Sequence, residues 1–88
     1  MKRERLEIIK DILEIVKDNI SIKTTPLLRK SNLSSQRFTE YLTELLKKEL
    51  LKESLDKKQK KIIKLTDKGF KYLEKYRTIK NFIDEFDL

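Results

Sequence analysis

Residues 34–48, SSQRFTEYLTELLKK, are the stretch that decides how this chain folds. Placed on a helix at about 100° per residue, its apolar side chains gather on one side: Phe38, Tyr41, Leu42, Leu45 and Leu46. The opposite side is polar, with two further residues at its flanks: Gln36, Glu40, Thr43 and Lys47, then Arg37 and Thr39. One face of this helix can therefore pack into a core while the other contacts a partner.

A short helix and a tight turn are predicted in front of that stretch. Thr24 or Thr25 can cap the short helix, and Pro26 suits its first turn, where a missing amide hydrogen costs nothing. Asn32 tolerates the left-handed conformation of a tight turn, and Ser34 is a good N-cap for the longer helix. The two helices together predict a helix-turn-helix, although any antiparallel helix pair with a polar turn gives a similar pattern.

A basic hairpin is predicted after the longer helix. Residues 50–55 and 61–66 alternate in polarity as strands do, and residues 20–22 form a third, shorter stretch that can pair with them. The segment between the two longer strands offers four lysines against the single acid Asp56: Lys57, Lys58, Lys60 and Lys61. Such a charge run is usually only a solvated loop. Because this basic run follows the helix of residues 34–48, which is the candidate recognition helix, we interpret the hairpin as a wing.

Two longer helices are predicted at the ends of the chain. The first runs from Arg3 to about Asp18 and serves as a scaffold, because its apolar stripe covers nearly half its circumference. The last runs from about Asp67 to Asp87, with Phe70 and Leu73 placed to close the core. Gly69 falls in its first turn and would allow close approach to a neighbouring element.

A second apolar stripe follows on the last helix, at intervals of four, three, four and three residues: Tyr72, Tyr76, Ile79, Ile83 and Phe86. This spacing is typical of a coiled-coil seam, with Phe82 beside it. An antiparallel pair with a second copy would bring acids near lysines: Asp84, Glu85 and Asp87 near Lys71, Lys75 and Lys68. The alternative is that the helix folds back on its own domain and hides Phe82 and Phe86 there. We expect a winged helix-turn-helix domain over residues 1–70 and an antiparallel coiled-coil dimerisation helix over 71–88, in a mainly α (α+β) chain.

Composition narrows the classes of function. The 88 residues contain no Cys and no His, which excludes disulfides, thiolate and imidazole catalysis and most transition-metal sites. We therefore expect no catalytic residues, no metal and no cofactor, and no small-molecule ligand is evident. No apolar run approaches the roughly 20 residues that span a bilayer, so we expect a soluble, cytoplasmic protein with no membrane partner. The net charge of +7 favours polyanionic partners.

Double-stranded DNA is the expected partner. Phosphate contacts are expected from basic side chains around the exposed helix face and in the wing: Lys23, Arg29, Lys30, Lys47, Lys57, Lys58, Lys60 and Lys61. Any base reading would come from the helix itself, with Thr25 nearby: Ser35, Gln36, Arg37, Thr39 and Thr43. Gln can pair with adenine and Arg with guanine, but Ser and Thr read little by themselves. Weak sequence preference follows.

The assembled pattern resembles the archaeal family of ten-kilodalton, chromatin-associated winged helix-turn-helix proteins, which dimerise through a C-terminal antiparallel coiled coil. The resemblance is carried by RERLEIIKDILE, KTTPLL, SNLSSQRFTEYLTELLKKELL and KLTDKGFKYLEKY. It implies sequence-tolerant, nucleoid-associated DNA binding by a homodimer, with one helix in the major groove and the wing along the backbone. It does not distinguish chromatin packaging from transcriptional regulation. Glu49 stands where such proteins commonly have glycine, and the C-terminal seam is short.

Two other classes of function remain open. The winged fold can serve as a protein–protein interaction adaptor whose working surface is the aromatic C-terminal helix. An enzyme is the more distant reading, because the carboxylates of the first helix fall at the three- and four-residue spacing of an ordinary solvated stripe: Glu7, Asp11, Glu14 and Asp18.

Overall fold

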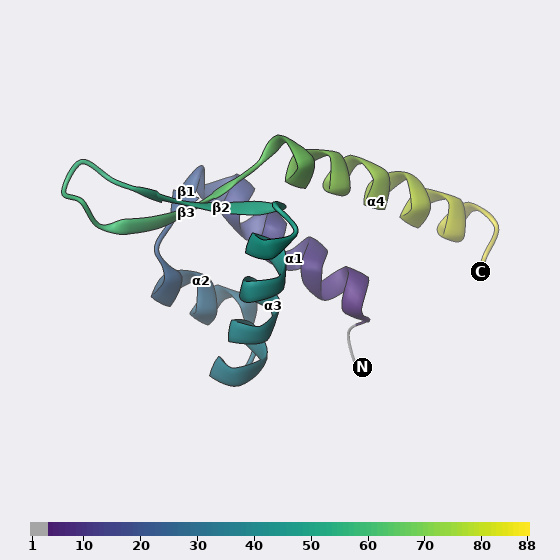
Figure 1. Cartoon of the computed structure of the whole chain (residues 1–88). Helices are drawn as coiled ribbons and strands as arrows, with labels where there is room; N and C mark the ends of the chain where they lie inside the picture. Colours follow the sequence, from purple (N-terminus) through teal and green to yellow (C-terminus); the bar gives the residue numbers. More distant parts are fainter. Residues whose placement is uncertain (1–3) are drawn as a thin grey trace.

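The computed structural model describes residues 4–88 as four helices and a small antiparallel sheet (Figure 1). In chain order the elements are α1 (Arg5–Asn19), β1 (Ser21–Ile22), α2 (Thr24–Ser31), α3 (Ser35–Lys47), β2 (Leu51–Leu55), β3 (Lys61–Leu65) and α4 (Asp67–Glu85). The strand order is β1-β3-β2, with β3 pairing antiparallel to both neighbours. The mainly helical winged arrangement predicted from the sequence is confirmed, and the predicted start of the first helix at Arg3 lies outside the described residues.

The core lies where α1, α2, α3 and the sheet meet. Side chains from four different elements have an exposed fraction of 0%, among them Leu13, Leu27, Leu45 and Ile63. Each comes from a position that the periodicity of its own element turns inward. The scaffold role of α1 is confirmed, since five of its residues are buried.

The start of α2 differs from the prediction. Lys23 occupies the N-cap position without a side-chain capping bond, and Thr24 and Thr25 lie inside the helix. The reason is that β1 pairs with β3 as far as Ile22, so the chain leaves the sheet and enters the helix within one residue. Asn32 is left-handed at φ 58°, as predicted for the end of this helix.

The start of α3 matches the prediction, and the chain leaves this helix at Glu49, the position where the resembled family commonly has glycine. Ser34 Oγ accepts a hydrogen bond from the backbone N–H of Arg37 at 3.2 Å. After Lys47, Glu49 takes a left-handed conformation at φ 61°. Its N–H donates to the carbonyl of Leu46 at 3.1 Å, and the next N–H donates to the carbonyl of Leu45 at 2.9 Å. This pair of bonds is a Schellman motif, in which glutamate holds the position that usually favours glycine.

The start of α4 is fastened to the end of α3. Thr66 caps the helix by accepting from the Gly69 N–H at 3.0 Å, and its hydroxyl donates to the carbonyl of Glu49 at 2.6 Å. A Cβ atom on Gly69 would lie 2.4 Å from the carbonyl oxygen of Leu50. The close approach predicted for this glycine is confirmed.

The body of α4 packs on α1, and its far end extends beyond the rest of the domain (Figure 1). Leu73 is half-buried against the core, as predicted. Phe70 is 45% exposed, so the prediction that it closes the core is wrong. Gly69 and Leu73 make the close contacts with the body, which leaves Phe70 at the rim. α4 is one continuous helix across residue 70. Among residues 4–88, no helix is long and apolar enough to span a membrane.

Candidate nucleic-acid interface

The wing is a hairpin that projects away from α4 (Figure 1). Its strands are held in register from Leu51 opposite Leu65 to Leu55 opposite Lys61. The lysines at its tip are exposed: Lys57, Lys58 and Lys60. Beyond the last strand pair these side chains have no core to pack on, so their positions depend on the backbone of the tip.

The backbone of the tip is organised by Asp56. Its Oδ1 accepts from the N–H of Lys58 at 2.8 Å and from the N–H of Lys60 at 2.9 Å. These backbone hydrogen bonds, that from Lys60 foremost, hold the pKa of the Asp56 carboxyl below its usual value, and the charge of Lys23 lowers it further. Gln59 completes the turn in a left-handed conformation at φ 62°. Lys23 follows directly after Ile22, which pairs opposite Ile63 of β3, so this lysine lies where β3 runs toward the wing tip.

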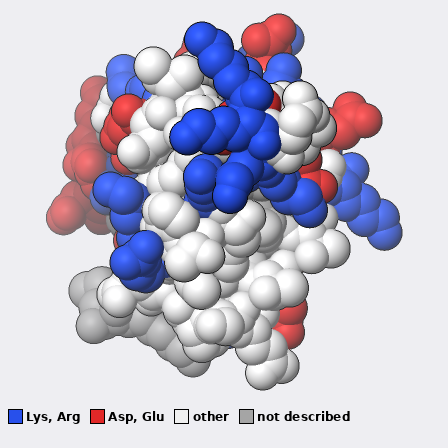
Figure 2. All heavy atoms as spheres, turned by 90° about the vertical axis from the view of Figure 1, so that its left-hand side faces the viewer, with Lys and Arg blue, Asp and Glu red and all other residues white. Residues whose placement is uncertain are grey.

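The wing end of the molecule is strongly basic (Figure 2). Lysine and arginine side chains gather over the upper part of this face, and a largely uncharged surface lies below them. Arg29 and Lys30 are exposed on the last turn of α2. Lys61 differs from the other wing lysines because its ammonium pairs with Glu53 at 3.0 Å. The pair depends on the register of the hairpin, and no signal in the local sequence predicts it.

The exposed face of α3 is where the sequence predicted it. The polar residues expected there, and Thr25 on α2, are all exposed: Ser35, Gln36, Arg37, Thr39, Thr43 and Lys47. The hydroxyl of Thr39 donates to the Ser35 carbonyl at 2.9 Å, so its hydrogen is already used within the helix. Glu40, in the middle of this face, is exposed as well. The face can enter a groove but carries little positive charge of its own.

A second carboxylate on α3 serves a different purpose. Glu44 pairs with Arg5 of α1 and with Lys48, the latter at 2.7 Å. The guanidinium of Arg5 also lies 5.9 Å from the ring centre of Tyr41. These contacts tie the middle of α3 to the start of α1. The sequence gives no local signal for them, because Arg5 and Glu44 are 39 residues apart.

The residues predicted for the dimer seam fall into two groups. Tyr72 donates its hydroxyl hydrogen to the Leu6 carbonyl at 2.9 Å, and the ammonium of Lys10 lies 5.8 Å from the ring centre of Tyr76. These two tyrosines therefore pack against α1 of their own chain. The others lie further along the helix, half-buried in one case and exposed in three: Ile83, then Ile79, Phe82 and Phe86.

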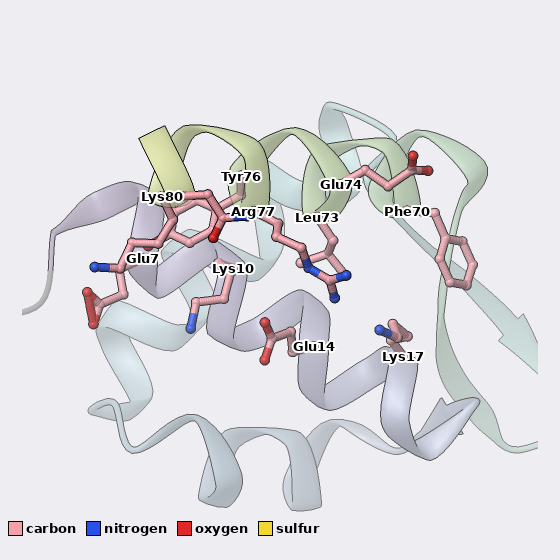
Figure 3. Close-up of a pocket in the computed structure, with 11 residues that line it drawn as sticks. Glu7, Lys10, Glu14, Lys17, Phe70, Leu73, Glu74, Tyr76, Arg77 and Lys80 are labelled. Carbon is pink, nitrogen blue, oxygen red and sulfur yellow. The ribbon is translucent and has the colours of Figure 1, made fainter. Parts of the chain in front are cut away.

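An open groove of about 680 Å³ runs between α1 and α4 (Figure 3). Arg77 points from α4 toward α1, and Phe70 stands at the end near Lys17. Acidic and basic side chains are mixed along the walls: Glu7, Lys10, Glu14, Lys17, Glu74, Arg77 and Lys80. With both acidic and basic residues in its lining, the groove favours neither anionic nor cationic ligands. Within residues 4–88, no three acidic, His or Cys side chains come together in a way that could hold a metal ion.

The elements now described define a class of protein. A short helix, a tight turn, a helix with an exposed polar face and a basic hairpin are the parts of a winged helix-turn-helix, a class that generally binds DNA. A family model described as winged helix-turn-helix matches residues 2–84, and the chain belongs to this family. No curated protein matches the chain.

Proposed function

We propose that the protein binds double-stranded DNA as a homodimer, as a chromatin protein or transcriptional regulator of the archaeal ten-kilodalton type, acting on the nucleoid in the cytoplasm. The observation that carries this proposal is the arrangement of charge around α3. Lys23, next to the paired end of β1, and the lysines of the wing tip are exposed, and basic side chains gather at this end of the molecule (Figure 2). The exposed face of α3 is polar and nearly neutral. In this proposal, contacts between lysines and phosphates supply most of the affinity, and α3 supplies the shape that fits the groove.

In this mode α3 enters the major groove, which is about wide enough for one helix. The wing lies along the backbone, and Arg29 and Lys30 approach phosphates from α2. Gln36 and Arg37 are the side chains with the strongest capacity to read bases. Glu40 on the same face repels phosphate and limits how deeply α3 is inserted. These features support binding with weak sequence preference.

The proposed dimer rests on the far half of α4. Ile79, Phe82 and Phe86 are each more than half exposed, and the two phenylalanine rings lie 4.9 Å apart, centre to centre. Apolar side chains at coiled-coil spacing on a projecting helix favour pairing with a second copy. Asp84 already pairs with Lys80 at 3.0 Å within its own chain. In an antiparallel pair, attraction to the partner's lysines would therefore fall mainly to Glu85 and Asp87.

The proposal is tested by titrating a fluorescent duplex with the protein at several salt concentrations. If each half of a dimer contacts about four phosphates, the slope of log affinity against log salt is roughly −7. Lys57→Glu/Lys58→Glu should weaken binding at least about tenfold and flatten the slope, because two phosphate contacts per chain become repulsive. Lys17→Glu/Arg77→Glu, on the groove between α1 and α4, makes the same charge change away from the wing and should have a much smaller effect. A slope near zero, or equal losses in both variants, would refute DNA binding through the wing.

A protein–protein adaptor is the second candidate, favoured by the exposed aromatic end of α4. An adaptor would keep its partner when the wing lysines are reversed and lose it when Phe82 and Phe86 are replaced. Duplex binding separates the two functions, because an adaptor has no reason to bind DNA with a steep salt dependence.

A further inference from the structure

The tip of the wing contains an acid at the centre of a basic surface. A carboxylate beside DNA phosphates is unfavourable by charge alone. Asp56, however, points its Oδ1 at two backbone N–H groups of its own turn, those of Lys58 and Lys60. Its backbone joins the same network, donating to the Lys60 carbonyl and accepting from Gln59, both at 2.9 Å.

This network fixes the backbone from which the lysine side chains of the tip extend. Four hydrogen bonds connect Asp56 with three of the residues that follow it, Lys58, Gln59 and Lys60, and two of these bonds end on its carboxylate. Gln59 adopts a left-handed conformation that a residue with a side chain rarely takes unless its neighbours hold it there. Without the carboxylate oxygen, the N–H groups of Lys58 and Lys60 would turn to water and the tip would sample several conformations. The loss of conformational entropy when DNA binding orders the tip would then weaken binding.

We propose that Asp56 is a positioning residue for DNA binding: its side-chain oxygen holds the wing tip in the one backbone conformation that presents Lys57, Lys58 and Lys60 to phosphates. The inference rests on the proposed DNA-binding function and deepens it. The favourable effect of a fixed tip outweighs the repulsion between one carboxylate and the DNA. Replacement of this acid by a side chain that cannot accept the two hydrogen bonds should therefore weaken binding, although it makes the protein more positive.

Two variants with the same net charge separate the two effects. Asp56→Asn keeps an oxygen that accepts from both N–H groups and removes the charge, so its affinity for a duplex should equal or exceed that of the wild type. Asp56→Ala removes both the charge and the acceptor, and its affinity should be about three- to tenfold below that of Asp56→Asn. Asp56→Ser, with one hydroxyl acceptor, should fall between them.

Amide hydrogen exchange in the free protein gives a readout that does not depend on DNA. The amides of Lys58 and Lys60 should exchange faster in Asp56→Ala than in Asp56→Asn, while core amides of α1 stay equally protected in both. Thermal unfolding of each variant confirms that the domain is folded, as expected for a substitution at an exposed tip.

The possible outcomes distinguish this inference from the function on which it rests. If the wild type binds duplex with a steep salt dependence and the asparagine and alanine variants bind equally well, the positioning role of Asp56 is overturned and DNA binding stands. Tighter binding by Asp56→Ala than by Asp56→Asn would overturn it as well. If the wild type does not bind duplex, both the function and the inference fail.

Discussion

Replacing Glu49 by glycine should stabilise the protein, against the usual effect of introducing glycine. Glu49 is exposed and has φ 61°, at the position where α3 ends. A residue with a Cβ in this conformation costs roughly 1–2 kcal/mol relative to the right-handed region, and glycine does not bear this cost. Part of the gain is offset because glycine gives the unfolded chain more freedom, worth roughly 0.4–1 kcal/mol.

The net stabilisation expected for Glu49→Gly is roughly 0.5–1 kcal/mol. For a chain of 88 residues this corresponds to a rise in Tm of about 2–8 °C. Thermal unfolding followed by circular dichroism measures the shift, and urea unfolding gives the free energy independently. Both should be run at one protein concentration, since the stability of a dimer depends on it.

Two control variants show whether the backbone is the cause. Glu49→Ala removes the same carboxylate but keeps a Cβ, so it should not raise the Tm. Lys48→Gly places glycine one residue earlier, where φ is −84°, and should lower stability by roughly 1 kcal/mol. If Glu49→Gly is no more stable than Glu49→Ala, the strain argument for the end of α3 is wrong.

Three further predictions concern the ends of α4 and the wing. Gly69→Ala should destabilise the protein by about 1–3 kcal/mol in urea unfolding, because the new Cβ would lie 2.4 Å from a backbone carbonyl that cannot move aside freely; a neutral effect would show that α4 can shift. Ile79→Asp should convert the proposed dimer to a monomer in analytical ultracentrifugation while the domain keeps its helical circular dichroism, and a mass still equal to that of a dimer would exclude Ile79 from the proposed interface. The wing tip should loosen at low pH, because the pKa of Asp56 in the folded protein lies below the usual 3.8. The stabilisation of the tip by the Asp56 carboxylate is present above pH 3.8 and is lost as the pH falls through the lower folded pKa. The NMR shifts of the Lys58 and Lys60 amides would report this change.

The features that could be predicted from the sequence depend on neighbouring residues. Ser34 and Thr66 cap their helices with hydrogen bonds to residues three positions later, and Asn32 ends α2 by its own conformational tolerance. Each of these signals is complete within a few residues. The alternation of the wing strands is equally local, which is why the hairpin was predicted with nearly correct bounds.

The features that the sequence did not reveal depend on how separate elements meet. Phe70 and Leu73 are both plausible core positions on an isolated helix, and only the placement of α4 on the body decides that Leu73 is covered and Phe70 is not. The turn at the tip of the wing shows the same limit. Asp56 looks like one unfavourable charge in a basic loop until its hydrogen bonds to Lys58 and Lys60 are seen.

The junction between α3 and α4 bears on how a dimer would meet DNA. Lys68 of α4 donates to the carbonyl of Lys48 at 3.0 Å, and Thr66 donates to the carbonyl of Glu49, so the first turn of α4 is bonded to the last turn of α3. Arg5 connects the middle of α3 to α1, on which α4 also packs. Two copies paired through α4 would therefore hold their α3 helices at a spacing set by rigid helices rather than by a flexible linker. A spacing fixed in this way would favour duplexes whose successive major grooves match it, even when no base is read.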